Sequence, residues 1–383
     1  MININSSMQD LLKAQQFEIV NTIKLLIYKE KPTLLEKVDY NDDSVFMEPL
    51  LFAYFNSKRE NISSLEILEE LMQGFFIKTV PTFFNPLHYK NTVVYLPRIG
   101  YFRSSESELF EEIAFIKNTN IEILKYPINL LKSSFRNINN EIVYEEAIII
   151  DEDLYIKNIN FLTNAFLIIK SNSQEHYELI ELYCKKCMMF KCNLKDINSF
   201  AAISAHGIAF FNVNQDDYDE VFFIDDIAHQ TGHIILTTLF YDKKLIFKIN
   251  NKQIIGELLQ INDYRDFYTL LHALYTYYTT LLCLDDCLKI NSFNESQKKE
   301  VIGRIGFYQI KCEHDLAKLQ EIIIYYGGIE NVLTQDGIDV CLLIKNKYSE
   351  ITNKWNSITS KFNYKNQTYN FSYSIFTQDN NQI

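Results

Sequence analysis

Turn-forming residues are scarce in this chain, and this scarcity is the feature that most limits its fold. The 383 residues include only 10 glycines and 6 prolines. Glycine and proline supply many of the tight connections that a many-stranded sandwich or barrel requires. Hydrophobic residues make up 47% and charged residues 22% of the chain, so it can bury a core of its own. We therefore expect a mostly α-helical globular fold.

The spacing of apolar residues predicts where the secondary structure lies. We expect a few short strands near the middle of the chain and a helical domain that holds a metal site. No linker marks a boundary, so we divide the chain into an N-terminal, mainly helical region of unknown role (1–140) and a metal-binding catalytic domain (141–383), or treat both as one continuous domain. The predicted helices cover 9–30, 104–118, 175–192, 225–240, 265–286, 295–326 and 337–362, and the predicted strands lie at 207–212 and within 243–262.

Charge and cysteine content exclude several classes of protein. The net charge of −12 offers no basic surface for nucleic acid. No apolar run is long enough to span a membrane, and the first residues lack the apolar core of a signal peptide. Seven cysteines are an odd number in a long chain, which does not suit a disulfide framework. We expect a cytoplasmic protein with reduced thiols, and the sequence does not indicate its oligomeric state.

Two histidines on one predicted helix are the strongest indication of chemistry. His229 and His233 are four residues apart, so they share a helix face and can bind one ion. His272 lies on the next long predicted helix, and Arg265 precedes it by seven residues on the same face. Three neutral imidazoles with open coordination positions suit zinc or non-haem iron, and a guanidinium suits a carboxylate. The alternative is that these are helix-face histidines with unrelated partners.

The residue after the first histidine limits the reaction. In zinc peptidases with an HExxH helix, a glutamate takes a proton from metal-bound water. This chain has Gln230 there, which cannot act as a base, whereas an iron oxygenase does not need one. Gly232 leaves space for another backbone to approach the helix, and Asp225 or Asp226 is expected to cap its N-terminus.

Four segments resemble one enzyme family. Segment 224–240, "IDDIAHQTGHIILTTLF", looks like the metal-binding helix of the HExxH-type 2-oxoglutarate-dependent peptide β-hydroxylases. Segments 264–278 and 319–346 are similar to two later parts of that family, and 204–212 resembles the strand before its metal helix. The resemblance covers residues 145–345.

The resemblance implies a function and a set of site residues. It implies that His229, His233 and His272 bind Fe(II), with zinc as the alternative metal. It also implies that Arg265 binds 2-oxoglutarate and that Gln230 occupies the position of the family's glutamate in the catalytic site. The expected reaction is hydroxylation of a β-carbon in a ribosomally synthesised peptide, a precursor with a leader segment.

The chain also departs from the family, which leaves two further hypotheses open. Gln230 stands where the family has glutamate, and Asp266 and residues 268–271 stand where it has proline and glycine-containing residues. One alternative is a catalytically silent relative that binds peptides. The other is a zinc metallopeptidase-like protein that has lost its general base at Gln230.

Overall fold

The computed structural model describes residues 6–57, 65–78, 93–103, 109–137, 141–142, 147–215, 217–289, 293–367 and 369–381. These residues form two compact units, each built from segments that are separate in the sequence. The helical unit comprises the described residues of Met1–Gln15, Asn164–Leu179 and Asp217–Ile383, and the mixed unit those of Gln16–Thr163 and Ile180–Asp216. The two-domain division expected at residue 140 stays a prediction.

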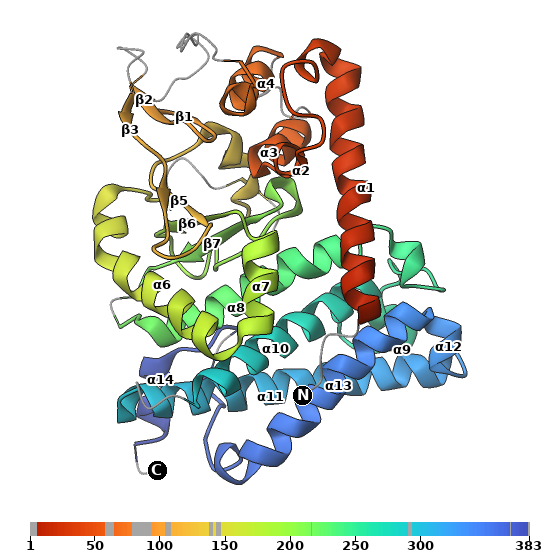
Figure 1. The fold of residues 1–383 in the computed structure, drawn as a ribbon. Helices are drawn as coiled ribbons and strands as arrows, with labels where there is room; N and C mark the ends of the chain where they lie inside the picture. Colours follow the sequence, from red (N-terminus) through yellow and green to blue (C-terminus); the bar gives the residue numbers. More distant parts are fainter. Residues whose placement is uncertain are drawn as a thin grey trace. The chain divides into compact units, whose positions relative to one another are not determined.

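The helical unit is built around long helices that pack in sequence order (Figure 1). Helix α8 packs against α10, α10 against α11, and α11 against α13. Side chains that accept hydrogen bonds from first-turn backbone N–H groups start each of these four helices. The elements that begin in this unit are α1 (Ser6–Glu30), α8 (Glu220–Leu239), η7 (Lys243–Leu245), α9 (Ile255–Leu259), α10 (Phe267–Cys287), α11 (Glu295–Tyr325), α12 (Ile329–Val332), α13 (Gln335–Thr359) and α14 (Tyr373–Asp379).

The mixed unit contains the strands. A sheet of order β1-β2-β3 is antiparallel throughout, and a second sheet of order β4-β5-β6-β7 pairs β5, β6 and β7 in parallel. The remaining elements are η1 (Pro32–Leu34), α2 (Asp43–Phe46), α3 (Pro49–Ser57), α4 (Leu65–Met72), η3 (Gln73–Phe75), β1 (Val93–Leu96), β2 (Gly100–Arg103), β3 (Leu109–Glu111), β4 (Ala114–Phe115), β5 (Glu122–Leu124), η5 (Asn129–Ser134), α6 (Glu152–Asn172), α7 (Gln174–Tyr183), β6 (Lys186–Phe190), η6 (Ile203–Ala205) and β7 (Ile208–Asn212).

A glycine sets how closely α8 and α10 approach. A Cβ atom added at Gly232 would lie 2.5 Å from Thr279 Oγ1 and 3.4 Å from the Thr276 Cα atom. The Thr279 hydroxyl also donates a hydrogen bond to the backbone oxygen of Ala228 (2.9 Å), which ties the helices together at this level. The structure thus confirms that Gly232 makes room for a neighbouring backbone.

The predicted fold class is confirmed: the described part of the chain is mostly helical, with a few short strands in the middle. The helices predicted at 9–30, 295–326 and 337–362 correspond to α1, α11 and α13, and the strand predicted at 207–212 corresponds to β7. These are long periodic segments or short apolar runs after a glycine, in which local pattern and final structure agree.

The helix predicted at 104–118 is wrong where the structure describes it. Residues 104–108 lie outside the described residues, and the rest contains the strands β3 and β4 and no helix. Strand β3 pairs with β2, and β4 pairs with β5. These partner strands are distant from a local window of sequence, so helical spacing alone could not reveal them.

Two further predictions of secondary structure are corrected. The helix predicted at 175–192 ends with α7 at Tyr183, and the apolar run after it is strand β6, which is buried along its whole length between β5 and β7. A short apolar run is compatible with a helix or a buried parallel strand, and its neighbours decide. The strand pair predicted within 243–262 is instead the short helices η7 and α9.

All seven cysteines are buried and free of disulfides, including Cys184 and Cys187. Burial raises the pKa of the Cys187 thiol, which keeps it protonated and unreactive. Among the described residues, no helix is both long enough and apolar enough to cross a membrane.

Candidate metal centre

The three histidines predicted as metal ligands come together between α8 and α10. The ring centroids of His229 and His233 on α8 are 5.0 Å apart, and those of His233 and His272 are 4.6 Å apart. All three side chains are half-buried. We call these residues the histidine cluster.

The histidine cluster is uncharged at neutral pH. Burial, and secondarily the Lys311 charge, lowers the pKa of His229 to about 3. Burial also lowers the pKa of His272 to about 4, and burial with the two neighbouring imidazoles lowers the pKa of His233 well below its usual value. Neutral imidazole is the form that binds transition metals.

Two nitrogens of the cluster are unsatisfied. His229 Nδ1 and His272 Nε2 are buried and have no hydrogen-bond partner in the described part of the chain. His272 also donates a hydrogen bond to the backbone of His233, which opposes the effect of burial on its pKa and orients its ring. Leaving a buried polar atom unsatisfied costs about 1–3 kcal/mol, so a bound cation would remove a real penalty.

The donor set therefore fits a metal chemically. Within the described ranges, however, no three His, Cys, Asp or Glu side chains already stand in an arrangement that would hold an ion. Metal binding by His229, His233 and His272 stays a prediction, supported by their proximity, neutrality and unsatisfied nitrogens.

Arg265 is not on the helix that carries His272. It lies just before α10, whose N-cap is Asp266. Its guanidinium binds Asp263 (2.8 and 3.1 Å) and, in a second bidentate pair, Asp315 (2.7 and 2.8 Å). These carboxylates raise the pKa of Arg265. To bind 2-oxoglutarate, Arg265 would have to exchange an aspartate for it, and its assignment to that ligand stays a prediction.

Gln230 is held in a buried position beside the cluster. Its side chain is only 3% exposed, and Nε2 donates a 3.1 Å hydrogen bond to Asp226 one turn earlier. Its Oε1 atom is buried and accepts no hydrogen bond from any residue that the structure describes. An amide in this position can donate or accept a hydrogen bond but cannot take a proton from water near neutral pH.

The prediction that Asp225 or Asp226 caps α8 is wrong, because the helix begins at Glu220 and Asp219 is its cap. Asp225 is instead buried, and it accepts hydrogen bonds from Arg304 Nη1 (2.6 Å) and the Tyr308 hydroxyl (2.8 Å). An acidic residue within a buried helix is stable when a partner on another helix neutralises it. That partner is remote in sequence and could not be inferred locally.

Sequence reasoning missed a polar stripe on α11. Its residues recur at intervals of three and four, so they lie on one helix face, which includes the side toward α8 and α10. The sequence did contain an indication of this stripe: in the long helix predicted at 295–326, charged and polar residues recur at the three- and four-residue spacing expected of buried positions. The stripe consists of Arg304, Tyr308, Lys311, Asp315 and Lys318.

Tyr308 and Lys311 bring this stripe to the histidine cluster. The Tyr308 and His229 ring centroids are 6.0 Å apart, and Tyr277 on α10 lies 6.4 Å from His229. Lys311 Nζ is 5.5 Å from the centroid of Tyr277. Burial lowers the pKa of Lys311 to about 8, so its ammonium form is only moderately favoured at neutral pH.

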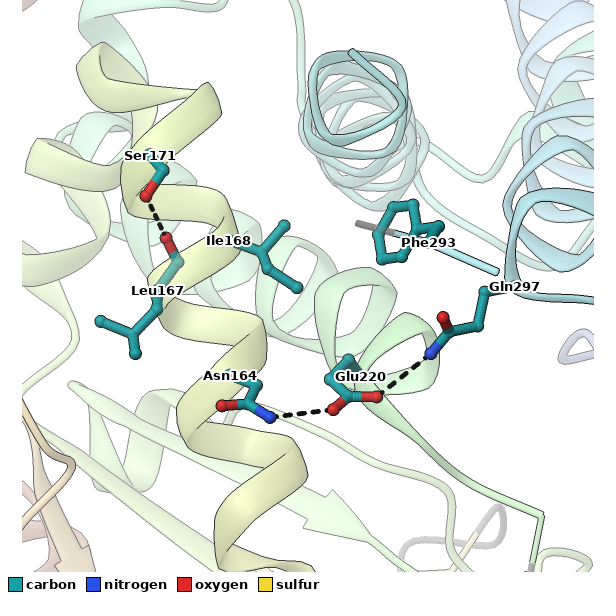
Figure 2. A pocket seen from close by; sticks show the side chains of 7 residues that line it. All are labelled: Asn164, Leu167, Ile168, Ser171, Glu220, Phe293 and Gln297. Atoms are coloured by element: carbon teal, nitrogen blue, oxygen red, sulfur yellow. Dashed lines mark hydrogen bonds between the residues drawn. The ribbon is translucent and has the colours of Figure 1, made fainter. Parts of the chain in front are cut away.

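A separate cavity of about 430 Å³ lies at the N-terminal end of α8. Figure 2 shows Glu220 in its wall, accepting hydrogen bonds from Asn164 (2.9 Å) and Gln297 (3.2 Å). Because Glu220 precedes His229 by nine residues, the two are about 14 Å apart along the helix. The polar groups of this cavity satisfy one another, and it is distinct from the histidine cluster.

No family model matches the chain, and no curated protein matches it.

Proposed function

We propose that the protein is an Fe(II)- and 2-oxoglutarate-dependent hydroxylase that acts on a β-carbon of a ribosomally synthesised precursor peptide in the cytoplasm. The overall reaction converts R–H, 2-oxoglutarate and O₂ into R–OH, succinate and CO₂. One oxygen atom of O₂ enters the product alcohol and the other enters succinate. The peptide is oxidised and 2-oxoglutarate is oxidatively decarboxylated.

The observation that carries the proposal is the cluster of three neutral imidazoles, two of them with a buried unsatisfied nitrogen. His229, His233 and His272 would hold the iron. When bound, iron supplies the activation of O₂ that no amino-acid side chain provides. The resemblance of segment 224–240 to a peptide hydroxylase helix supports the choice of reaction.

The other residues serve to hold this cluster in place. Gly232 lets α8 and α10 approach, and Asp225, bonded to Arg304 and Tyr308, fixes α8 against α11. Gln230 makes no proton transfer in this proposal. The hydrogen bond that its side-chain amide donates to Asp226 holds a polar, uncharged group beside His229.

The test is iron content after anaerobic reconstitution, followed by 2-oxoglutarate-dependent release of succinate. We expect the wild-type protein to bind one equivalent of Fe(II) and His229→Ala to bind none. His314→Ala on α11 is the matched control, because this histidine is exposed and outside the cluster. Equal iron content in both variants would refute the site, and iron without succinate release would refute the reaction.

A catalytically silent peptide-binding relative is the second candidate. Gln230, which stands where the resembled family has glutamate, favours it. It predicts that the wild-type protein retains no iron or zinc after reconstitution, whereas the hydroxylase proposal requires a stoichiometric metal.

The zinc metallopeptidase-like candidate makes a different prediction about Gln230. Restoring the base with Gln230→Glu should then switch on peptide cleavage in zinc-loaded protein. We expect no cleavage, because the added carboxylate would face Asp226, to which Gln230 now donates. Zinc-dependent cleavage by Gln230→Glu would displace the hydroxylase proposal.

A further inference from the structure

Lys311 is a half-buried cation that has no carboxylate partner among the described residues. Its Nζ atom donates a 2.7 Å hydrogen bond to the backbone oxygen of Tyr369. Aromatic rings surround it, with centroids 4.4 Å (Tyr369), 4.8 Å (Phe307) and 5.5 Å (Tyr277) from Nζ. No ion pair within 4.0 Å includes Lys311 in the described part of the chain. Ring faces attract a cation but do not neutralise it.

The two carboxylates that act electrostatically on Lys311 each form an ion pair with an arginine. Asp225 and Asp315 oppose the effect of burial on the pKa of Lys311. Asp225 is paired with Arg304, and Asp315 is paired with Arg265. An anion that enters beside His229 therefore meets, in the Lys311 ammonium, a cation whose charge is not committed to an aspartate.

Lys311 also acts on the cluster itself. After burial, its charge is the largest influence that lowers the pKa of His229. Tyr277 connects the two groups, with its ring 5.5 Å from Lys311 Nζ and 6.4 Å from the His229 ring. Lys311 and His229 therefore lie on either side of one aromatic residue, Tyr277.

We propose that Lys311, rather than Arg265, binds the distal carboxylate of a small 2-oxo dicarboxylic acid that the histidine cluster uses. The inference rests on the proposed function, because the other end of this acid would be held at the metal. An ammonium bound by aromatic rings and one backbone carbonyl gains a charged partner, whereas Arg265 would have to lose one. A charged hydrogen bond of this kind corresponds to about a 10- to 100-fold gain in affinity.

The experiment compares two acids that differ only in the distal carboxylate. Calorimetry measures the binding of 2-oxoglutarate and 2-oxobutyrate to anaerobic, Fe(II)-loaded wild-type protein, Lys311→Met and Lys318→Met. Lys318 is the matched control, since it lies on α11 two turns beyond Lys311 and pairs with Asp263 and Asp315. We expect wild type and Lys318→Met to prefer 2-oxoglutarate by about 10- to 100-fold, and Lys311→Met to bind the two acids within about 3-fold.

Lys311→Arg separates loss of charge from loss of fold. It keeps the cation, so it should retain most of the preference for 2-oxoglutarate if Lys311→Met loses it. A preference that survives in Lys311→Met overturns the assignment, as does a wild-type protein that loads iron but binds both acids equally. Failure of the wild-type protein to load iron is detected separately by metal analysis, and it would remove the proposed function together with this inference.

Discussion

Helix α8 carries two polar clusters one turn apart, and they differ in how completely their atoms are satisfied. In the first, which we call the ion cluster, Arg304 binds Asp225 (2.6 Å) and Glu300 (2.7 and 2.9 Å), and Tyr308 donates to Asp225 (2.8 Å). In the histidine cluster, two buried nitrogens have no hydrogen-bond partner among the described residues, and the three imidazoles are neutral. A fully paired cluster indicates a structural role, whereas buried atoms without a partner make the histidine cluster a candidate site for a ligand.

The largest expected effect comes from breaking the ion cluster. Arg304→Met would leave the Asp225 and Glu300 carboxylates buried without a cation. Removing one partner of a buried ion pair costs about 3–5 kcal/mol in the free energy of unfolding. Urea unfolding at neutral pH measures the loss.

Arg304→Lys is the control for this prediction, because it keeps the charge and loses the forked geometry. It should lose less stability than Arg304→Met. If Arg304→Met unfolds at the same urea concentration as wild type, the ion cluster does not stabilise the helical unit, and the contrast with the histidine cluster disappears.

His176 is a buried histidine outside both clusters, and it tests what burial alone does to the pKa of a histidine. His176 is 2% exposed and lines a cavity of about 460 Å³, and within the described ranges neither ring nitrogen has a hydrogen-bond partner. Burial lowers its pKa from 6.5 to about 4, and Asp286 opposes this shift only in part. In the pH range between these values the unfolded chain binds more protons, so stability falls as the pH falls from 6.5 towards 4.

His176→Gln should remove this pH dependence. From pH 7 to pH 5, His176 alone accounts for about 2 kcal/mol of lost unfolding free energy. The histidine cluster contributes its own loss in both proteins, so the difference between the two pH profiles isolates His176. Urea unfolding at several pH values measures it, and parallel profiles would show that His176 is accessible to protons in the folded state.

The sequence predicted the long helices and the histidine spacing, because both follow from local periodicity. His229 and His233 had to share a face of any helix that contains them. The partners of α8 were not predictable in the same way. Arg304 follows Asp225 by 79 residues, and Asp315 follows Arg265 by 50. The same limit explains β6, whose strand character depends on its neighbours β5 and β7.

A smaller effect is expected where the two helices of the histidine cluster touch. In Gly232→Ala, the new Cβ atom would meet Thr279 Oγ1 at 2.5 Å, and overpacking of this kind costs about 1–3 kcal/mol. Alanine also favours the helix by about 1 kcal/mol, so the net loss should be about 1 kcal/mol. Urea unfolding measures this loss, and the double variant with Thr279→Ala should recover part of it. If the unfolding free energies of the two single variants add up in the double variant, the contact with Thr279 is not the cause of the loss in Gly232→Ala.

The smallest effect on stability is expected within the histidine cluster itself. His272→Leu removes the buried Nε2 atom, which has no partner among the described residues, together with the hydrogen bond that the ring donates to the His233 backbone. The metal-free protein should change by less than about 1 kcal/mol in unfolding free energy, because removing the unsatisfied nitrogen offsets the loss of the hydrogen bond to the His233 backbone. Urea unfolding at neutral pH without metal measures this change, and iron reconstitution of the same variant should fail. A loss of more than about 2 kcal/mol would instead assign His272 to the core. The stability loss of His272→Leu would then resemble that of Arg304→Met. In that case, unsatisfied atoms in the histidine cluster would no longer distinguish a ligand site from a structural ion cluster.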